Sequence, residues 1–133
     1  MKYTPENITH LEPNQIFTYG ANAAGIHGAG AAKLALRWGA KMGQYGLVGQ
    51  TYGIPTKNKK IQTLPLDKIQ VHVHDFLALA FSHPEYEFLV TKIGCGLALY
   101  EPKDIAPLFK IIKTGVFDNV ILPEEFHKII YVH

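Results

Sequence analysis

A glycine-rich segment near the N-terminus carries the residues whose types and spacing point most clearly to chemistry. Asn22 and His27 stand in this segment, and an alanine-rich stretch follows it. The glycines around them are Gly20, Gly25, Gly28 and Gly30. Glycine lets the backbone adopt positive φ and approach a ligand closely, and the start of a helix favours anions. The segment therefore predicts a loop that binds a phosphate-bearing ligand.

Asn22 and His27 are the candidate catalytic residues, and each has an alternative role. The Asn22 amide can hold a ribose hydroxyl or orient a water, or it can stabilise a turn. The His27 imidazole titrates near neutral pH, so it can act as an acid, a base or a ligand contact. It can also be a capping or surface histidine. No metal site is expected, because the histidines of the chain lack the spacing of metal ligands.

A second glycine loop, Gly94-Cys95-Gly96, follows another apolar run and is closed by Tyr100. The backbone of this loop is a stronger candidate for binding than the thiol. Cys95 is either a nucleophile or a small residue packed beneath the loop, and no histidine is placed by sequence to activate it. Tyr100 offers a flat face to a sugar or base, with core packing as the alternative.

The segments that position these loops alternate between strand and helix patterns. Strands are predicted at residues 16–19, 50–54, 87–93 and 119–122, and a further one in the tail at 129–132. Helices are predicted from residue 28 or 30 to about 42, from Pro65 to Ala80, and from Pro102 to about 112. This alternation is typical of an α/β fold with a mostly parallel sheet. Both glycine loops should then lie at the carboxyl edge of the sheet and face one ligand from two sides.

The composition limits the class of protein. With 133 residues, 47% of them hydrophobic and 18% charged, the chain is expected to form one globular domain over residues 1–133. A net charge of +2 without a basic stripe argues against a nucleic-acid partner. The single cysteine, Cys95, excludes an internal disulfide and fits a cytoplasmic location. No signal peptide is expected, because the first residues of the sequence form no apolar h-region. No membrane partner is expected either, since no apolar run approaches the roughly 20 residues that span a bilayer.

The two glycine loops resemble those of macrodomains, a family of α/β proteins that bind ADP-ribose. Residues 21–25 and 28–32 are similar to the family's asparagine-containing strand end, glycine loop and alanine-rich helix. Residues 93–100, Ile-Gly-Cys-Gly-Leu-Ala-Leu-Tyr, are similar to its second phosphate loop, Ile-Gly-x-Gly-x-x-x-Tyr. The resemblance spans about residues 16–123 and implies a compact, three-layer α/β/α fold with a mostly parallel sheet.

The resemblance also implies roles for individual residues. Asn22 would contact the distal ribose and orient an attacking water, and Tyr100 would lie near the same ribose. The full set of candidate ligand-binding residues is Gly20, Ala21, Asn22, Gly25, Gly28, Ala29, Gly30, Gly94, Cys95, Gly96, Leu97 and Tyr100. Two departures from the family pattern stand out. Asn7 occupies the place of the adenine-binding Asp, and the acidic catalytic residue of the first loop is missing.

These observations predict a protein that binds ADP-ribose or a related nucleotide diphosphate without a cofactor. An ADP-ribosylated protein is a further expected partner. One alternative is an enzyme that hydrolyses an ADP-ribosyl linkage, which the family's frequent activity favours. The other is a binding module without chemistry, which the small number of acid and base candidates favours. Binding of a different nucleotide is the third alternative.

Overall fold

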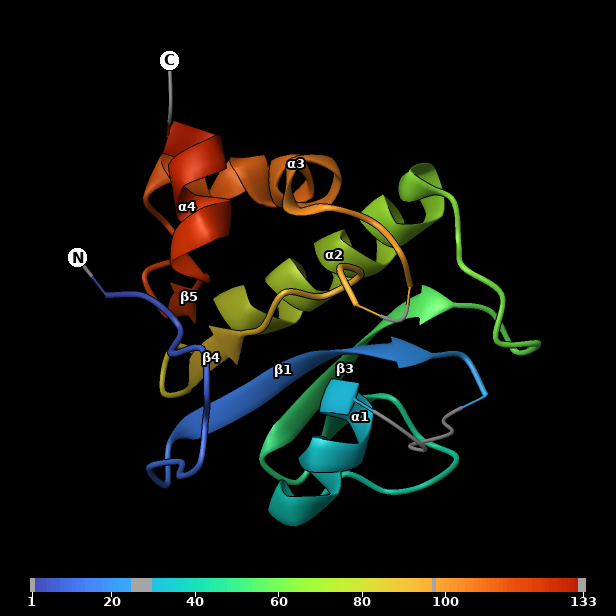
Figure 1. Ribbon diagram of the computed structural model, residues 1–133. Coiled ribbons are helices and arrows are strands. Elements are labelled where there is room, and N and C mark those ends of the chain that lie inside the picture. The colour runs from blue at the N-terminus through green and yellow to red at the C-terminus, as the bar shows by residue number, and fades with distance from the viewer. Residues whose placement is uncertain (1, 25–29, 97, 132–133) are drawn as a thin grey trace.

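The computed structural model describes residues 2–24, 30–96 and 98–131 (Figure 1). Its strands are β1 (Gln15–Asn22), β2 (Gly46–Val48), β3 (Thr51–Lys57), β4 (Glu87–Val90) and β5 (Val120–Ile121). Its α-helices are α1 (Gly30–Ala35), α2 (Leu66–Phe81), α3 (Pro102–Ile105) and α4 (Glu124–Tyr131). Two 3₁₀ helices, η1 (Leu36–Trp38) and η2 (Ala106–Thr114), continue α1 and α3. The predicted α/β class is confirmed.

The strands of the described chain form one five-stranded sheet in the order β2-β3-β1-β4-β5. β1 pairs parallel with β3 and with β4, and β4 pairs parallel with β5. The edge strand β2 pairs antiparallel with β3, so the sheet is mixed. The sequence does not predict β2, because the glycines of residues 43–53 indicate only a turn that leads into the next strand.

The chain crosses the sheet in two directions. It leaves β1 through α1 to reach β3 on one side, and leaves β3 through α2 to reach β4 on the other side of β1. The connections that follow β1 and β4 therefore diverge at the carboxyl edge of the sheet. In open α/β sheets this reversal point is where ligands bind. Here it lies between β1 and β4.

Hydrophobic clusters on the two faces of the sheet hold these strands in place. Successive strand residues point to opposite faces. Ile16 and Phe88 belong to the cluster that contains the buried stripe of α2, whereas Phe17 and Leu89 belong to the cluster that contains Ala35 of α1. Figure 1 shows α1 on one side of the sheet and α2, α3 and α4 on the other. The carboxyl ends of β1 and β4 are thus fixed from both faces.

Helix α2 follows the prediction, and two other helices are shorter than expected. The predicted helix to about residue 42 is α-helical only to Ala35, and Gly39, with φ +101°, ends the 3₁₀ turn in a left-handed conformation. The predicted helix from Pro102 is α-helical only to Ile105. Pro107 has no backbone N–H for an α-helical hydrogen bond, and the chain continues as η2.

The predicted strand in the tail, residues 129–132, is wrong. Residues 124–131 form the helix α4, and residue 132 lies outside the described chain. The buried residues Phe126 and Ile130 are four apart, which is helical spacing, and Glu124 and Glu125 favour a helix start. The β-branched residues near the end of the chain masked this pattern.

Candidate functional site

A cleft of about 360 Å³ lies at the carboxyl edge of the sheet, at the reversal point between β1 and β4. Ligand pockets typically occupy about 300–1,000 Å³. Within the described chain, the lining comes from the ends of β1 and β3, from the start of α1 and from the segment after β4. The cleft therefore lies where the topology predicts a ligand site.

The structure brings together residues from both glycine loops. The candidate residues that line this cleft are Gly20, Ala21, Asn22, Gly30, Gly94 and Gly96. The predicted position of the two loops at one edge of the sheet is thus confirmed for the described residues. One detail differs, because β1 continues to Asn22 and Gly20 pairs with Ile54 inside the sheet.

Several candidate residues lie outside the described chain. They are Gly25, His27, Gly28, Ala29 and Leu97. Their predicted roles stay predictions. The described residues hold no group of three or more His, Cys, Asp or Glu side chains that could share a metal ion.

Hydrogen bonds hold the strand ends that form the floor of the cleft. Both the backbone N–H and the side-chain hydroxyl of Thr91 donate to the Thr18 carbonyl, at 3.0 and 2.9 Å. The Ala23 N–H donates to the Lys57 carbonyl at 2.9 Å, which extends the β1–β3 pairing past the end of β1. A rigid floor reduces the cost of ordering the site when a ligand binds.

The second glycine loop turns tightly at Gly94 and returns to it at Tyr100. Gly94 has φ +73°, and its carbonyl accepts the Tyr100 N–H at 2.8 Å. Within the described chain, the N–H groups of Gly94 and Gly96 donate no backbone hydrogen bond. Such N–H groups in a tight turn can bind an anion. The loop is also tied to the neighbouring loop, since the Thr63 hydroxyl donates to the Ala98 carbonyl at 3.2 Å.

Two lysines of the cleft were missed by the sequence analysis. Lys57 ends β3 and Lys92 follows β4, and both line the cleft. No carboxylate is among its described lining residues. The cleft is therefore electropositive, as an anionic ligand requires. The signal that could have found these lysines is their position at the carboxyl ends of strands that flank β1.

The surroundings of Cys95 and Tyr100 are those expected for packing residues, which was the alternative to a chemical or ligand-binding role for each. Cys95 is half-buried, and its thiol donates to the Ile93 carbonyl at 3.4 Å. Burial, with a further contribution from the charge of Glu125, raises the pKa of this thiol to about 11. Tyr100 packs against the core cluster of α2, and its hydroxyl donates to the Leu64 carbonyl at 2.7 Å. At neutral pH Cys95 is thus a thiol rather than a nucleophilic thiolate.

Backbone strain is concentrated in the loops that border the cleft. Among described residues other than glycine, only Ile61 and Leu99 have positive φ, at 61° and 72°. Ile61 lines the cleft, and Leu99 lies in the second glycine loop with 85% of its surface exposed. Positive φ is costly for such residues, and strain of this kind clusters at functional sites.

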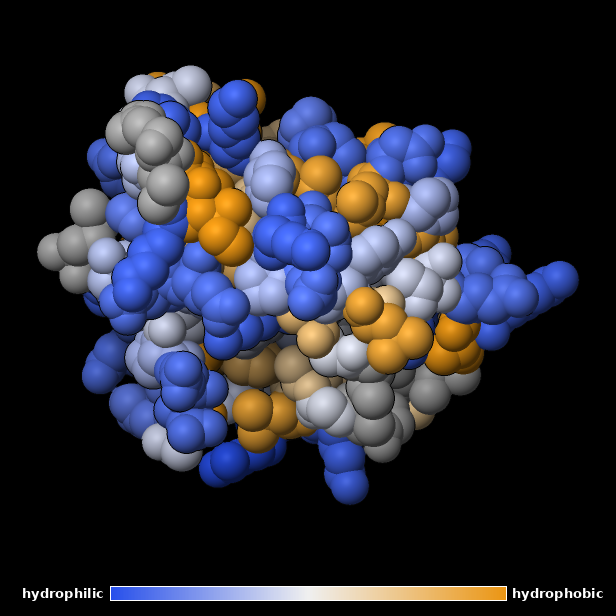
Figure 2. All heavy atoms as spheres, turned by 45° about the horizontal axis from the view of Figure 1, so that its top comes forward, coloured by the Kyte–Doolittle hydropathy of each residue, from blue (hydrophilic) through white to orange (hydrophobic). Residues whose placement is uncertain are grey.

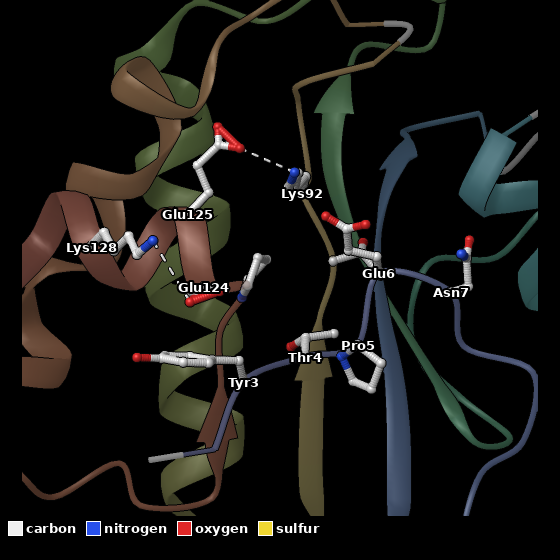
Figure 3. A pocket seen from close by; sticks show the side chains of 11 residues that line it. Tyr3, Thr4, Pro5, Glu6, Asn7, Lys92, Glu124, Glu125 and Lys128 are labelled. Carbon is white, nitrogen blue, oxygen red and sulfur yellow. Dashed lines mark ion pairs between the residues drawn. The ribbon is translucent and has the colours of Figure 1, made fainter.

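A larger cavity of about 900 Å³ adjoins the cleft (Figure 3). Thr91 and Lys92 line both cavities and form the wall between them. The N-terminal segment contributes Glu6 and Asn7 to the larger cavity, and α4 contributes Glu125. The Lys92 ammonium lies 3.1 Å from a Glu125 carboxylate oxygen.

On the face shown in Figure 2, exposed hydrophobic residues form small areas separated by hydrophilic ones. No helix of the described chain is both long and apolar enough to cross a bilayer.

A scan against protein-family models finds no match, and searches of curated proteins and of solved structures find none either. The function of the protein must therefore be inferred from the geometry of the cleft.

Proposed function

We propose that this protein binds a nucleotide diphosphate of the ADP-ribose type in the cleft between its two glycine loops. One observation carries the proposal: the end of β1 and the loop after β4 line one electropositive cleft at the reversal point of the sheet. The N–H groups of Gly94 and Gly96 would bind the phosphates, together with Lys57 and Lys92.

The arrangement of the elements supports a macrodomain-like reading of the fold. We propose three layers, with α1 on one face of the sheet and α2, α3 and α4 on the other. The arrangement in Figure 1 is compatible with these layers. Asn22, which lines the cleft, would bind a ribose hydroxyl. The larger cavity beyond Lys92 has room for the nucleoside end of the ligand, where Asn7 replaces the acidic residue of the family pattern.

Hydrolysis of an ADP-ribosyl linkage is the second candidate function. Asn22 favours it, because an amide beside the ligand can orient an attacking water, and the loop N–H groups can stabilise developing charge. Against it, the described lining of the cleft holds no histidine, cysteine or carboxylate that could act as acid or base. We therefore place binding first. An ADP-ribosylated protein in the cytoplasm is the natural partner of either function.

Calorimetric titration with ADP-ribose tests the proposal, followed by an assay for release of ADP-ribose from a mono-ADP-ribosylated protein. Binding without release supports the module. Release that is lost in Asn22→Ala, while the fold is retained, supports the hydrolase. Absence of binding at millimolar ADP-ribose contradicts both. A thermal-shift panel of other nucleotides then identifies the alternative ligand, because a ligand at 100 times its Kd stabilises the fold by about 2.7 kcal/mol.

A further inference from the structure

Lys92 lies on the wall between the two cavities, and a carboxylate of the larger cavity already binds its ammonium. Its Nζ is 3.1 Å from Oε1 of Glu125. Figure 3 shows Glu125 extending from α4 toward Lys92, with a dashed line marking the ion pair. Lys92 also lines the smaller cleft beside Gly94. One cation is therefore shared between a carboxylate on one side and the proposed phosphate site on the other.

We propose that Glu125 competes with the ligand's phosphates for Lys92 and thereby sets the affinity of the cleft for anions. This inference rests on the proposed function, because it requires a phosphate-bearing ligand in the smaller cleft. The Lys92 and Glu125 side chains are 42% and 51% exposed. A pair that is so exposed is weak, so a phosphate with its higher charge can displace the carboxylate.

The second lysine of the cleft lacks such a competitor in the described chain. Lys57 forms no ion pair with any described carboxylate. The two cations therefore differ: Lys57 adds attraction at all times, whereas Lys92 adds it in full only after Glu125 is displaced. Glu125 would thus act on the phosphates as a positioning residue, through Lys92, because it does not line the smaller cleft.

Glu124 offers a matched control on the same helix. It lines the same larger cavity and is 53% exposed, close to the value for Glu125. Its partner is Lys128, at 3.7 Å, and Lys128 does not line the cleft. Glu124→Gln and Glu125→Gln change the net charge equally, so any difference between them reports on Lys92.

The experiment is calorimetric titration of the full chain with two probes, ADP-ribose and inorganic pyrophosphate. Glu125→Gln should tighten both by about three- to fivefold, as expected from loss of an exposed competing ion pair. Glu124→Gln should leave pyrophosphate binding unchanged, and pyrophosphate is the decisive probe for this control, because Glu124 lines the cavity proposed for the nucleoside of ADP-ribose. In a Lys92→Met background, Glu125→Gln should have no effect. Circular dichroism and thermal melts confirm that each variant is folded.

With pyrophosphate as the probe, three results would overturn the inference: equal tightening by Glu124→Gln and Glu125→Gln, no tightening by Glu125→Gln, or tightening that persists without Lys92. The two probes separate this inference from the proposed function. The expected pattern with pyrophosphate, but no binding of ADP-ribose, rejects the proposed function alone. Binding of ADP-ribose, together with a pyrophosphate affinity that is equal in all charge variants, rejects the inference alone. If neither probe binds the wild-type chain or Glu125→Gln, both are rejected.

Discussion

The backbone of Gly20 in β1 lies close to the backbone of Gly94 in the second glycine loop. A Cβ placed on Gly20 would lie 3.4 Å from the Gly94 backbone nitrogen and 3.4 Å from the Thr56 hydroxyl oxygen. At this point β1 and the second glycine loop therefore approach each other closely. This contact places the Gly94 N–H next to the strand end that leads to Asn22, and it makes one binding site from two distant segments.

The two glycines of the second loop have different expected roles. Gly94→Ala should destabilise the fold by about 1–3 kcal/mol, because φ is +73° there and the new Cβ would lie 2.8 Å from Ile105 Cδ1. Gly96→Ala meets no atom within 4 Å, so its thermal midpoint should stay close to that of the wild type. Since Gly96 lines the cleft, its variant should instead weaken ligand binding. Equal thermal stability of the two variants would contradict this division.

Lys57 should contribute to affinity through its charge. Lys57→Met is expected to weaken ADP-ribose binding by about 1 kcal/mol, roughly fivefold, with an effect that shrinks as salt is added. Lys59→Met is the control, because Lys59 lies exposed in the next loop and outside the cleft lining. Calorimetry at several salt concentrations measures both. A loss of affinity that is the same for the two variants would show that only net charge matters.

At neutral pH the thiol of Cys95 should react slowly with alkylating reagents. Burial and the nearby Glu125 raise its pKa to about 11, so the reactive thiolate is scarce at neutral pH. The rate of iodoacetamide labelling should rise with pH toward a midpoint near 11. The unfolded chain loses this proton near pH 8.5, so folding stability should fall as pH rises from there. A labelling midpoint at or below 8.5 would contradict the buried placement.

A variant of Tyr100 tests two different roles for this residue. The structure uses its hydroxyl in a hydrogen bond within the protein, whereas the family resemblance implies a position near the distal ribose. Its hydroxyl donates to the Leu64 carbonyl, so Tyr100→Phe should cost about 1 kcal/mol of stability and leave ADP-ribose affinity unchanged. Chemical denaturation and calorimetry measure the two effects. A large loss of affinity at unchanged stability would instead place the tyrosine hydroxyl beside the ligand.

The sequence was sufficient to predict the parts of the fold with strong local patterns. The helical periodicity of its apolar residues identifies α2, and continuous runs of apolar, β-prone residues identify β1 and β4, because both patterns reflect burial. The glycine loops were placed at one sheet edge because parallel strands must end on the same side. Weak or conflicting local signals explain the errors: a three-residue strand between glycines, and a tail whose β-branched residues hid helical spacing.

The composition of the site was less predictable than its position. Lys57 and Lys92 look like ordinary surface lysines in the sequence, and only strand pairing brings them to one cleft. The ion pair between Lys92 and Glu125 joins the segment after β4 to α4, a helix that the sequence did not predict, so sequence spacing held no signal for it. Tyr100 had two readings in sequence, and its hydrogen bond to Leu64 depends on the path of a loop 36 residues earlier.

An NMR titration with ADP-ribose, following backbone amide resonances, tests the central claim most directly. The proposed site predicts saturable shifts that are largest for Gly20, Asn22, Gly94 and Gly96, which line one cleft from two distant segments. The amides of both glycine loops should report the same Kd, because one ligand contacts both. Absence of saturable shifts at millimolar ligand, or shifts confined to one loop or to another face, would contradict the account.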